Sequence, residues 1–130
     1  MLSNDDGSET SADQWMPVSP AIDSNTFDSS VGRNGIIVVH FWAIWDRYDR
    51  TMDAMIQELR PIYDGRIKFF SFNVDPQMNW NITVKYLIKS VPALGVFIDG
   101  AWLETMIGLR SQVQLTQELD KWLSASEHKV

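Results

Sequence analysis

The run Ile-Ile-Val-Val-His-Phe-Trp at residues 36–42 constrains the fold of this 130-residue chain more than any other segment. Six of its seven residues are apolar, and polar and apolar positions do not alternate along it. A strand of this kind is covered on both faces, as in the interior of a parallel or mixed sheet. The run therefore predicts an α/β protein in which helices lie on both sides of a central sheet.

The segments that follow residue 42 alternate between helix and strand patterns. Apolar residues at helical spacing predict a long amphipathic helix over residues 46–63, which Pro61 should kink or end. Residues 67–74 repeat the pattern of a buried strand, and residues 79–89 predict a helix that contains several weak helix formers. The early strands, which are joined through helices, are expected to pair in parallel by right-handed crossovers.

The last third of the chain predicts a hairpin and a closing helix. An Asp-Gly pair separates the expected strands at residues 94–98 and 102–107, and this pair is a strong hairpin signal. Ser111 and Gln114 have the spacing of a capping box, which starts the final helix. The hairpin makes the predicted sheet mixed, because its two strands are antiparallel.

Two short elements are expected before residue 36. Pro17 and Pro20 bracket an extended segment that is at best an edge strand. Ser24 or Asn25 is expected to cap a short helix that carries Phe27 and Val31 on one face. Trp15 and Met16 either pack on the domain or form a free recognition segment, and the sequence leaves both readings open.

Charge divides the chain into a leader and a body. The first thirty residues hold six acids and no lysine or arginine, whereas residues 31–130 hold eleven acids and eleven bases. Residues 1–20 are predicted to be an acidic, disordered leader, residues 21–125 a single domain, and residues 126–130 a tail. An acidic leader aids solubility more often than it recognises a partner, although a recognition role is a possible alternative.

Several functional classes are excluded by composition. The chain has no cysteine, which rules out thiolate nucleophiles, disulfides and metal–thiolate sites within it. No basic stripe suited to nucleic acid and no apolar run long enough for a membrane span is present. Without a recognisable secretory signal, a soluble cytoplasmic protein is expected. No cofactor and no metal are predicted.

A set of motifs in this order resembles the thioredoxin family. Residues 42–45 (Trp-Ala-Ile-Trp) match the family's WAxW motif, Val91-Pro92 matches its cis-proline loop, and Gly108 falls where a family glycine is expected. The resemblance covers about residues 22–124 and implies a thioredoxin fold, with a central mixed sheet flanked by helices on both faces.

The positions of the family's reactive Cys-Gly-Pro-Cys motif are changed completely. They hold Asp46, Arg47, Tyr48 and Asp49. Thiol–disulfide exchange requires a sulfur nucleophile, which neither aspartate provides. We therefore expect a redox-inactive member with no catalytic residues, and predict that the chain is not an enzyme.

The family's buried acid and its lysine partner correspond to His40 and Ser71, which predicts a neutral, buried polar pair. A hydrogen-bonded core histidine is favoured over a general base at His40, because buried polar groups are usually satisfied rather than catalytic. Asp46 and Asp49 are expected to cap the long helix. A hard-metal site that also includes Asp53 is a less favoured alternative.

The resemblance implies a peptide-binding groove formed by Trp45, Tyr48, Val91, Pro92 and Gly108. The function predicted is noncatalytic binding of a protein or peptide partner, in a chaperone-like, assembly or scaffold role. Packing alone is an equally weighted explanation of the Val-Pro turn. The alternative function is a non-redox enzyme that uses Asp46, Asp49 or His40 as acid–base groups. The sequence does not indicate an oligomeric state.

Overall fold

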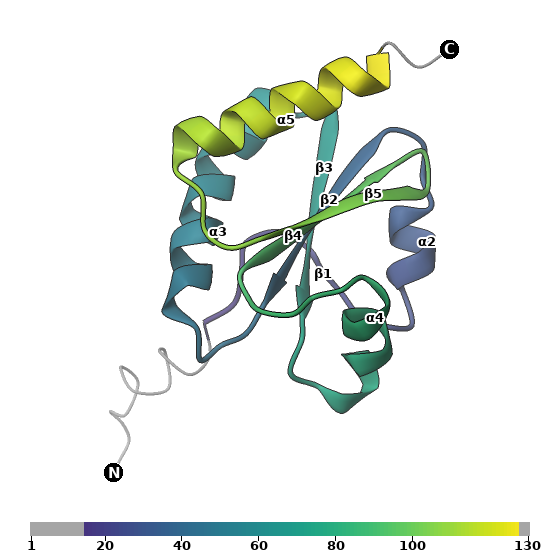
Figure 1. Cartoon of the computed structure of the whole chain (residues 1–130), viewed down its shortest axis with the longest axis vertical. Helices are drawn as coiled ribbons and strands as arrows, with labels where there is room; N and C mark the ends of the chain where they lie inside the picture. Colours follow the sequence, from purple (N-terminus) through teal and green to yellow (C-terminus); the bar gives the residue numbers. More distant parts are fainter. Residues whose placement is uncertain (1–14, 128–130) are drawn as a thin grey trace.

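The computed structural model describes residues 15–127 and shows one mixed sheet with the strand order β1-β3-β2-β4-β5 (Figure 1). The strands are β1 (Ala21–Ile22), β2 (Ile36–Trp42), β3 (Ile67–Asn73), β4 (Ala93–Ile98) and β5 (Ala101–Ile107). The helices are α2 (Phe27–Val31), α3 (Arg47–Leu59), α4 (Trp80–Lys85) and α5 (Gln112–Glu127), with 3₁₀ turns η1 (Arg60–Tyr63) and η2 (Gln77–Asn79).

Strand β2 lies in the middle of the sheet, and all seven of its residues are buried. It pairs in parallel with β3, from Ile36 opposite Ile67 to Trp42 opposite Asn73. On its other side it pairs antiparallel with β4, which forms the predicted hairpin with β5. The α/β fold, the parallel early strands and the antiparallel hairpin are all confirmed.

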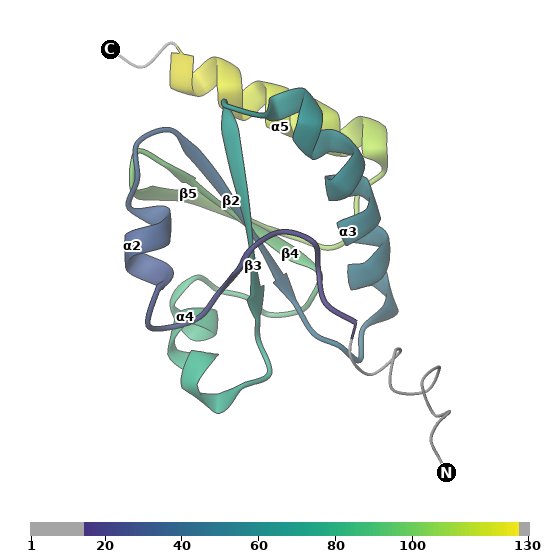
Figure 2. The same ribbon diagram turned by 180° about the vertical axis from the view of Figure 1, so that it is seen from behind.

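Helices cover both faces of the sheet (Figures 1 and 2). On one face, side chains of α3 and α5 such as Ile56 and Trp122 pack against Val38 of β2. On the other face, Phe27 of α2 and Ile82 of α4 pack in a second core. Strand β2 is therefore buried because helices cover both faces of the sheet, as its apolar composition predicted.

The helices differ in length from the sequence prediction. Helix α3 ends at Leu59 and continues as η1, which contains Pro61, as expected for a proline without an amide donor. Helix α4 is shorter than the predicted segment, because the chain turns after Lys85 and Leu87 adopts a φ of 60°. The weak helix formers in this segment are consistent with its early end.

The folded domain begins earlier in the chain than predicted. Residues 15–20 belong to the folded body: Trp15 lies edge-on to Trp42 with ring centroids 5.5 Å apart, and the amide of Val18 donates to Asp53 at 3.0 Å. The predicted leader boundary at residue 20 therefore lies too late in the chain, and of the two alternatives left open for Trp15, packing on the domain is the one observed. The rest of the predicted leader, residues 1–14, lies outside the described residues.

The start of α2 and the end of the chain also bear on the sequence predictions. Thr26 is the N-cap of α2, without a side-chain cap bond, so capping by Ser24 or Asn25 was wrong. The Asp23 carboxylate instead accepts the amides of Asn25 and Thr26 and so supports the turn before α2. Helix α5 extends to Glu127, past the predicted domain end at residue 125.

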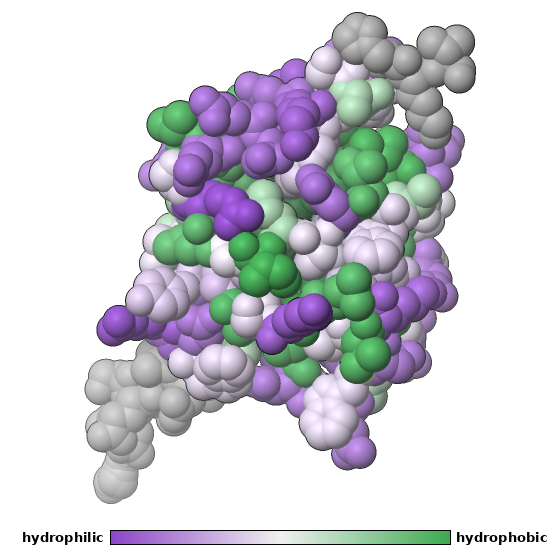
Figure 3. Space-filling view, in the orientation of Figure 1, coloured by the Kyte–Doolittle hydropathy of each residue, from purple (hydrophilic) through white to green (hydrophobic). Residues whose placement is uncertain are grey.

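The capping box of α5 is confirmed. The Ser111 hydroxyl accepts the amide of Gln114, and the Gln114 side chain accepts the amide of Ser111, each at 3.1 Å. The surface over α5 is mostly hydrophilic (Figure 3). None of the helices within residues 15–127 combines the length and the apolar character that a bilayer span requires.

Candidate functional site

The candidate site lies where β2 ends and α3 begins. Asp46 is the N-cap of α3, and its carboxylate accepts the amide of Tyr48 at 2.9 Å. The predicted capping role of Asp46 is thereby confirmed. It fixes the direction in which the first turn of α3 presents Tyr48 and Asp49.

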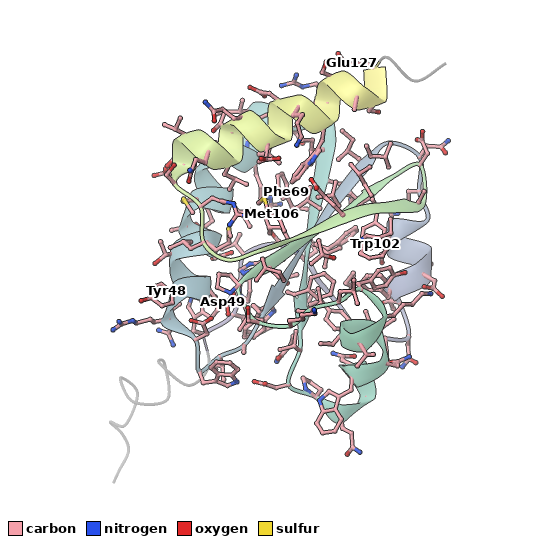
Figure 4. The ribbon with its side chains drawn as sticks, viewed as in Figure 1. Tyr48, Asp49, Phe69, Trp102, Met106 and Glu127 are labelled. Carbon is pink, nitrogen blue, oxygen red and sulfur yellow. The ribbon has the colours of Figure 1, made fainter. Side chains whose placement is uncertain are left out.

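Asp49 points into the protein from this turn, whereas Tyr48 points outward (Figure 4). The Asp49 side chain is fully buried, with Oδ2 accepting the amide of Ala43 at 3.0 Å and Oδ1 lying 2.9 Å from His40 Nε2. Burial raises the pKa of the Asp49 carboxyl, while the hydrogen bonds from His40 and Ala43 act in the opposite direction. Asp49 lies in the first turn of α3, as predicted, but its carboxylate bonds to His40 and to the amide of Ala43 and does not cap an amide of the helix.

His40 and Ser71 are buried and face each other across β2 and β3, but they do not form the predicted polar pair. His40 bonds to Asp49, and the Ser71 hydroxyl donates to the carbonyl of Ser19 at 2.9 Å. The physical reason is that α3 brings a carboxylate to the histidine, and a carboxylate is a stronger acceptor than a hydroxyl. The expectation of a hydrogen-bonded core histidine is confirmed, whereas its predicted partner was wrong.

The three aspartates considered as metal ligands are directed at different donors. Asp46 caps the helix, Asp49 bonds inside the core, and Asp53 accepts the amide of Val18 and the side chain of Gln57. Within residues 15–127 there is no group of three His, Asp or Glu side chains arranged to hold a metal ion.

Trp45 is the most conspicuous exposed side chain of the site. It is 71% exposed, and its indole Nε1 donates to Asp75 Oδ1 at 3.1 Å. Tyr48 is 49% exposed, and the guanidinium of Arg47 lies 5.3 Å from its ring centroid. Two aromatic side chains just before and within the first turn of α3 are thus presented to solvent, and one of them is anchored by a hydrogen bond.

The Val-Pro turn is at the same end of the sheet. Ala93 of β4 pairs with Phe41 near the end of β2. Because the two strands are antiparallel, the preceding residue, Pro92, lies at the level of Trp42. The Val91–Pro92 peptide bond is cis, and the carbonyl of Pro92 accepts the amide of Gly108 at 2.8 Å. Pro92 is buried, while Val91 and Gly108 are half-buried. The predicted groove residues therefore come from adjacent strand ends.

Sequence reasoning missed Asp75 and Trp80 as members of this surface. The indole of Trp80 donates to the backbone carbonyl of Asp75 at 3.2 Å. Trp45 and Trp80 thus both form hydrogen bonds to Asp75. Trp80 is 54% exposed. The position of Asp75 after a strand was a visible signal, but the contribution of Trp80 depends on the turn η2, which the sequence did not predict.

Comparison with known proteins identifies the family. A family model described as thioredoxin matches residues 18–121, which is most of the chain. The chain belongs to the thioredoxin family. The match fits the strand order, the two helix layers and the cis Val91–Pro92 turn described above.

Individual thioredoxins are similar over the same region. Thioredoxin M2, chloroplastic, from Arabidopsis thaliana is 34% identical over 103 residues, which cover 78% of this chain and 54% of that protein. Thioredoxin M-type, chloroplastic, from Brassica napus is 32% identical, with coverage of 80% and 58%. A Staphylococcus epidermidis thioredoxin is 32% identical over 78% of this chain and 95% of its own length. The matched region thus spans little more than half of the two plant proteins.

These relatives correct one prediction. Thioredoxins are disulfide oxidoreductases, and the chain shares 32–34% identity with them over most of its length, so the prediction that it is not an enzyme is overturned. That prediction rested on the lack of cysteine, and the absence of one residue type does not show that a chain has no enzymatic activity. The expected cytoplasmic location stays a prediction, because the relatives include both chloroplastic and bacterial proteins.

Proposed function

We propose that this thioredoxin-family chain binds an extended segment of a protein partner on the surface formed by Trp45, Tyr48, Val91, Pro92 and Gly108. Chaperone-like, assembly and scaffold roles are all forms of this binding. The observation that carries the proposal is Trp45, a large indole that is mostly exposed yet held in place through Asp75. A rigid exposed aromatic side chain loses little conformational entropy on binding, which is why tryptophan is common at binding hot spots.

The position of Asp49 supports a role in which binding, not thiol chemistry, is the contribution of this surface. Both of its carboxylate oxygens are engaged inside the protein, by Ala43 and His40. Transfer of electrons between sulfurs needs a sulfur nucleophile, and the chain contains no cysteine. We therefore propose a redox-inactive role for this surface.

The buried positions of His40 and Asp49 argue against the alternative acid–base site. Their side chains are 1% and 0% exposed, and a catalytic acid or base must come within hydrogen-bond reach of its substrate. Asp46, the third candidate, is also buried and is occupied with capping α3. We do not propose a second function.

A peptide-display library panned against the full chain tests the proposal. The selected peptide should be bound with perturbation of the Trp45 indole and Gly108 amide resonances in NMR spectra. Trp45→Ala should weaken binding about tenfold or more, as loss of a hot-spot side chain does. Trp102→Ala is the matched control, because Trp102 is a partly exposed tryptophan on β5.

The proposal fails if peptides bind Trp45→Ala as tightly as the unchanged chain, provided that thermal unfolding shows both to be folded. It also fails if the resonance changes map to a different surface. Insulin-disulfide reduction that depends on this chain would separately contradict the redox-inactive part of the proposal.

A further inference from the structure

A second feature lies at the opposite end of the sheet from Trp45. An open hollow of about 810 Å³ surrounds the start of β3 and is bordered by Val18, Pro20 and the connection between α3 and β3. Strands β2 and β3 are parallel, with Ile36 and Ile67 at this end and Trp42 at the other. The hollow is therefore separate from the surface of the proposed function.

The hollow occurs where the edge of the sheet is incomplete. Strand β1 pairs with β3 only at Ser71 and Phe72, and the chain before β1 turns away toward α3, where Val18 bonds to Asp53. Residues 67–70 of β3 consequently have no partner in β1. In Figure 2 the N-terminal segment crosses β3 beyond its start, which leaves the first part of the strand beside the hollow.

Positive charge is concentrated around this hollow. Four of the eleven lysines and arginines of the chain line it, and Asp64 is the single acid among the lining residues. The four cations are Arg33, Arg60, Arg66 and Lys68. Between residues 15 and 127, the salt bridges within 4.0 Å are His40–Asp49 and Lys121–Glu118, so none of the four is paired with a carboxylate in this way.

The cations form two pairs on opposite sides of β3. Arg33 and Lys68 both lie over the ring of Phe70, at 5.8 and 5.5 Å from its centroid, on the face that α2 covers. Arg60 and Arg66 come from the connection after α3, where Arg66 lies over the ring of Tyr63 in the other core. Stacking on aromatic rings orients Arg33, Lys68 and Arg66 but leaves their charges without an anion.

We propose that this hollow binds an extended acidic segment of a protein partner. Successive side chains of an extended chain point to opposite sides, so neighbouring carboxylates can reach the two cation pairs at once. A compact anion at one pair leaves the other pair unused. Arginine is well suited to such contacts because its planar guanidinium binds carboxylates through two parallel hydrogen bonds.

Fluorescence anisotropy with the full chain tests the proposal. The probe is a fluorescein-labelled peptide with a run of four glutamates flanked by serines, and the control probe has glutamines in their place. The glutamate peptide should bind, with an affinity that falls as salt is added, and the glutamine peptide should not. Amide resonances of residues 66–69 should shift in NMR spectra.

Paired substitutions examine the two sides separately. Arg33→Gln with Lys68→Gln, and Arg60→Gln with Arg66→Gln, should each weaken binding about tenfold, since each removes two charge contacts. Lys85→Gln with Lys89→Gln is the matched control, because it changes the net charge equally at exposed residues outside the hollow. This control and Trp45→Ala should leave binding of the glutamate peptide unchanged, which separates this site from the proposed function.

Three outcomes overturn the proposal. An equal loss in the Lys85/Lys89 control shows nonspecific charge attraction. Tight binding of tripolyphosphate that depends on one cation pair alone shows a site for a compact anion. Binding of the peptide only after Asp5, Asp6, Glu9 and Asp13 are changed to amides shows that the chain's own N-terminal acids are the occupant.

Discussion

His40 Nε2 lies 2.9 Å from Asp49 Oδ1, and both side chains are buried between the central strand β2 and the first turn of α3. Asp49, which stands where the family has its second cysteine, is therefore bonded to a residue of the central strand. The other ring nitrogen, His40 Nδ1, is buried without a hydrogen-bond partner among the described residues. The pair therefore combines a strong contact with an unsatisfied polar atom, and both features have measurable consequences.

The first prediction concerns the pH dependence of stability. Burial raises the pKa of Asp49 in the folded protein above its ordinary value of 3.8, so the folded state retains a proton that the unfolded chain has released. The contribution of this group to the free energy of unfolding therefore increases as the pH falls through the raised pKa toward 3.8, and it is lost as the pH rises.

Asp49→Asn should remove this contribution. Urea unfolding of both proteins from neutral to acidic pH measures it as a difference curve, in which the unchanged chain gains stability relative to the variant on acidification. Parallel curves for the two proteins would contradict the raised pKa.

The second prediction compares two substitutions at the same position. Asp49→Ala leaves the amide of Ala43 and both ring nitrogens of His40 without partners, whereas Asp49→Asn retains an oxygen acceptor. Asp49→Ala should therefore be less stable than Asp49→Asn by about 2–4 kcal/mol, the range for unsatisfied buried polar groups. Urea unfolding at neutral pH measures the gap, and equal stabilities would show that the hydrogen bonds contribute nothing.

The third prediction concerns Tyr63, which is buried and donates its hydroxyl to Asp120 at 2.7 Å. Burial, followed by this hydrogen bond and the charge of Asp120, raises the pKa of Tyr63 to about 12 from 10.0. Its contribution to stability is fully present below pH 10.0 and is lost as the pH rises toward 12.

Asp120→Asn should lower the pKa of Tyr63, because the acceptor loses its negative charge. Ultraviolet absorbance of tyrosinate during alkaline titration measures this, with Tyr63→Phe identifying the signal of Tyr63. A Tyr63 titration that Asp120→Asn leaves unmoved would assign the whole shift to burial.

The fourth prediction concerns a close approach inside the sheet. A Cβ atom on Gly95 of β4 would lie 2.8 Å from Cε2 of the buried Phe41 ring. Gly95→Ala should destabilise the protein by about 1–3 kcal/mol, the usual range for overpacking. In a Phe41→Leu background the same substitution should be less destabilising, since the ring is gone. An identical penalty in both backgrounds would exclude the Phe41 clash as its cause.

The fifth prediction concerns the start of α5. Ser111→Ala removes the acceptor of the Gln114 amide and should destabilise the protein by about 1 kcal/mol. Ser111→Asp should retain most of the stability, because an aspartate also accepts at the N-cap and its charge suits the helix dipole. Thermal unfolding of the three proteins gives the comparison, and equal losses for alanine and aspartate would argue against capping.

The sequence by itself determined the elements whose cause is local. The apolar run at residues 36–42 required burial on both faces, and the Ser111–Gln114 spacing produced the observed capping box. Asp46 was identified as a cap for the same reason, because a side chain that bonds to an amide two residues away depends on little beyond its neighbours. The thioredoxin motifs then fixed the fold and the location of the candidate surface.

The tertiary structure decided the partners that are distant along the chain. His40 pairs with Asp49 and not with Ser71, because the packing of α3 on the sheet brings the carboxylate within 2.9 Å of the ring. The docking of Trp15 on Trp42 and the hollow beside Lys68 likewise arise where separate segments meet. Hydrophobic pattern determines which residues are buried, but the arrangement of packed elements determines which polar groups meet, and that arrangement is set only when the whole chain folds.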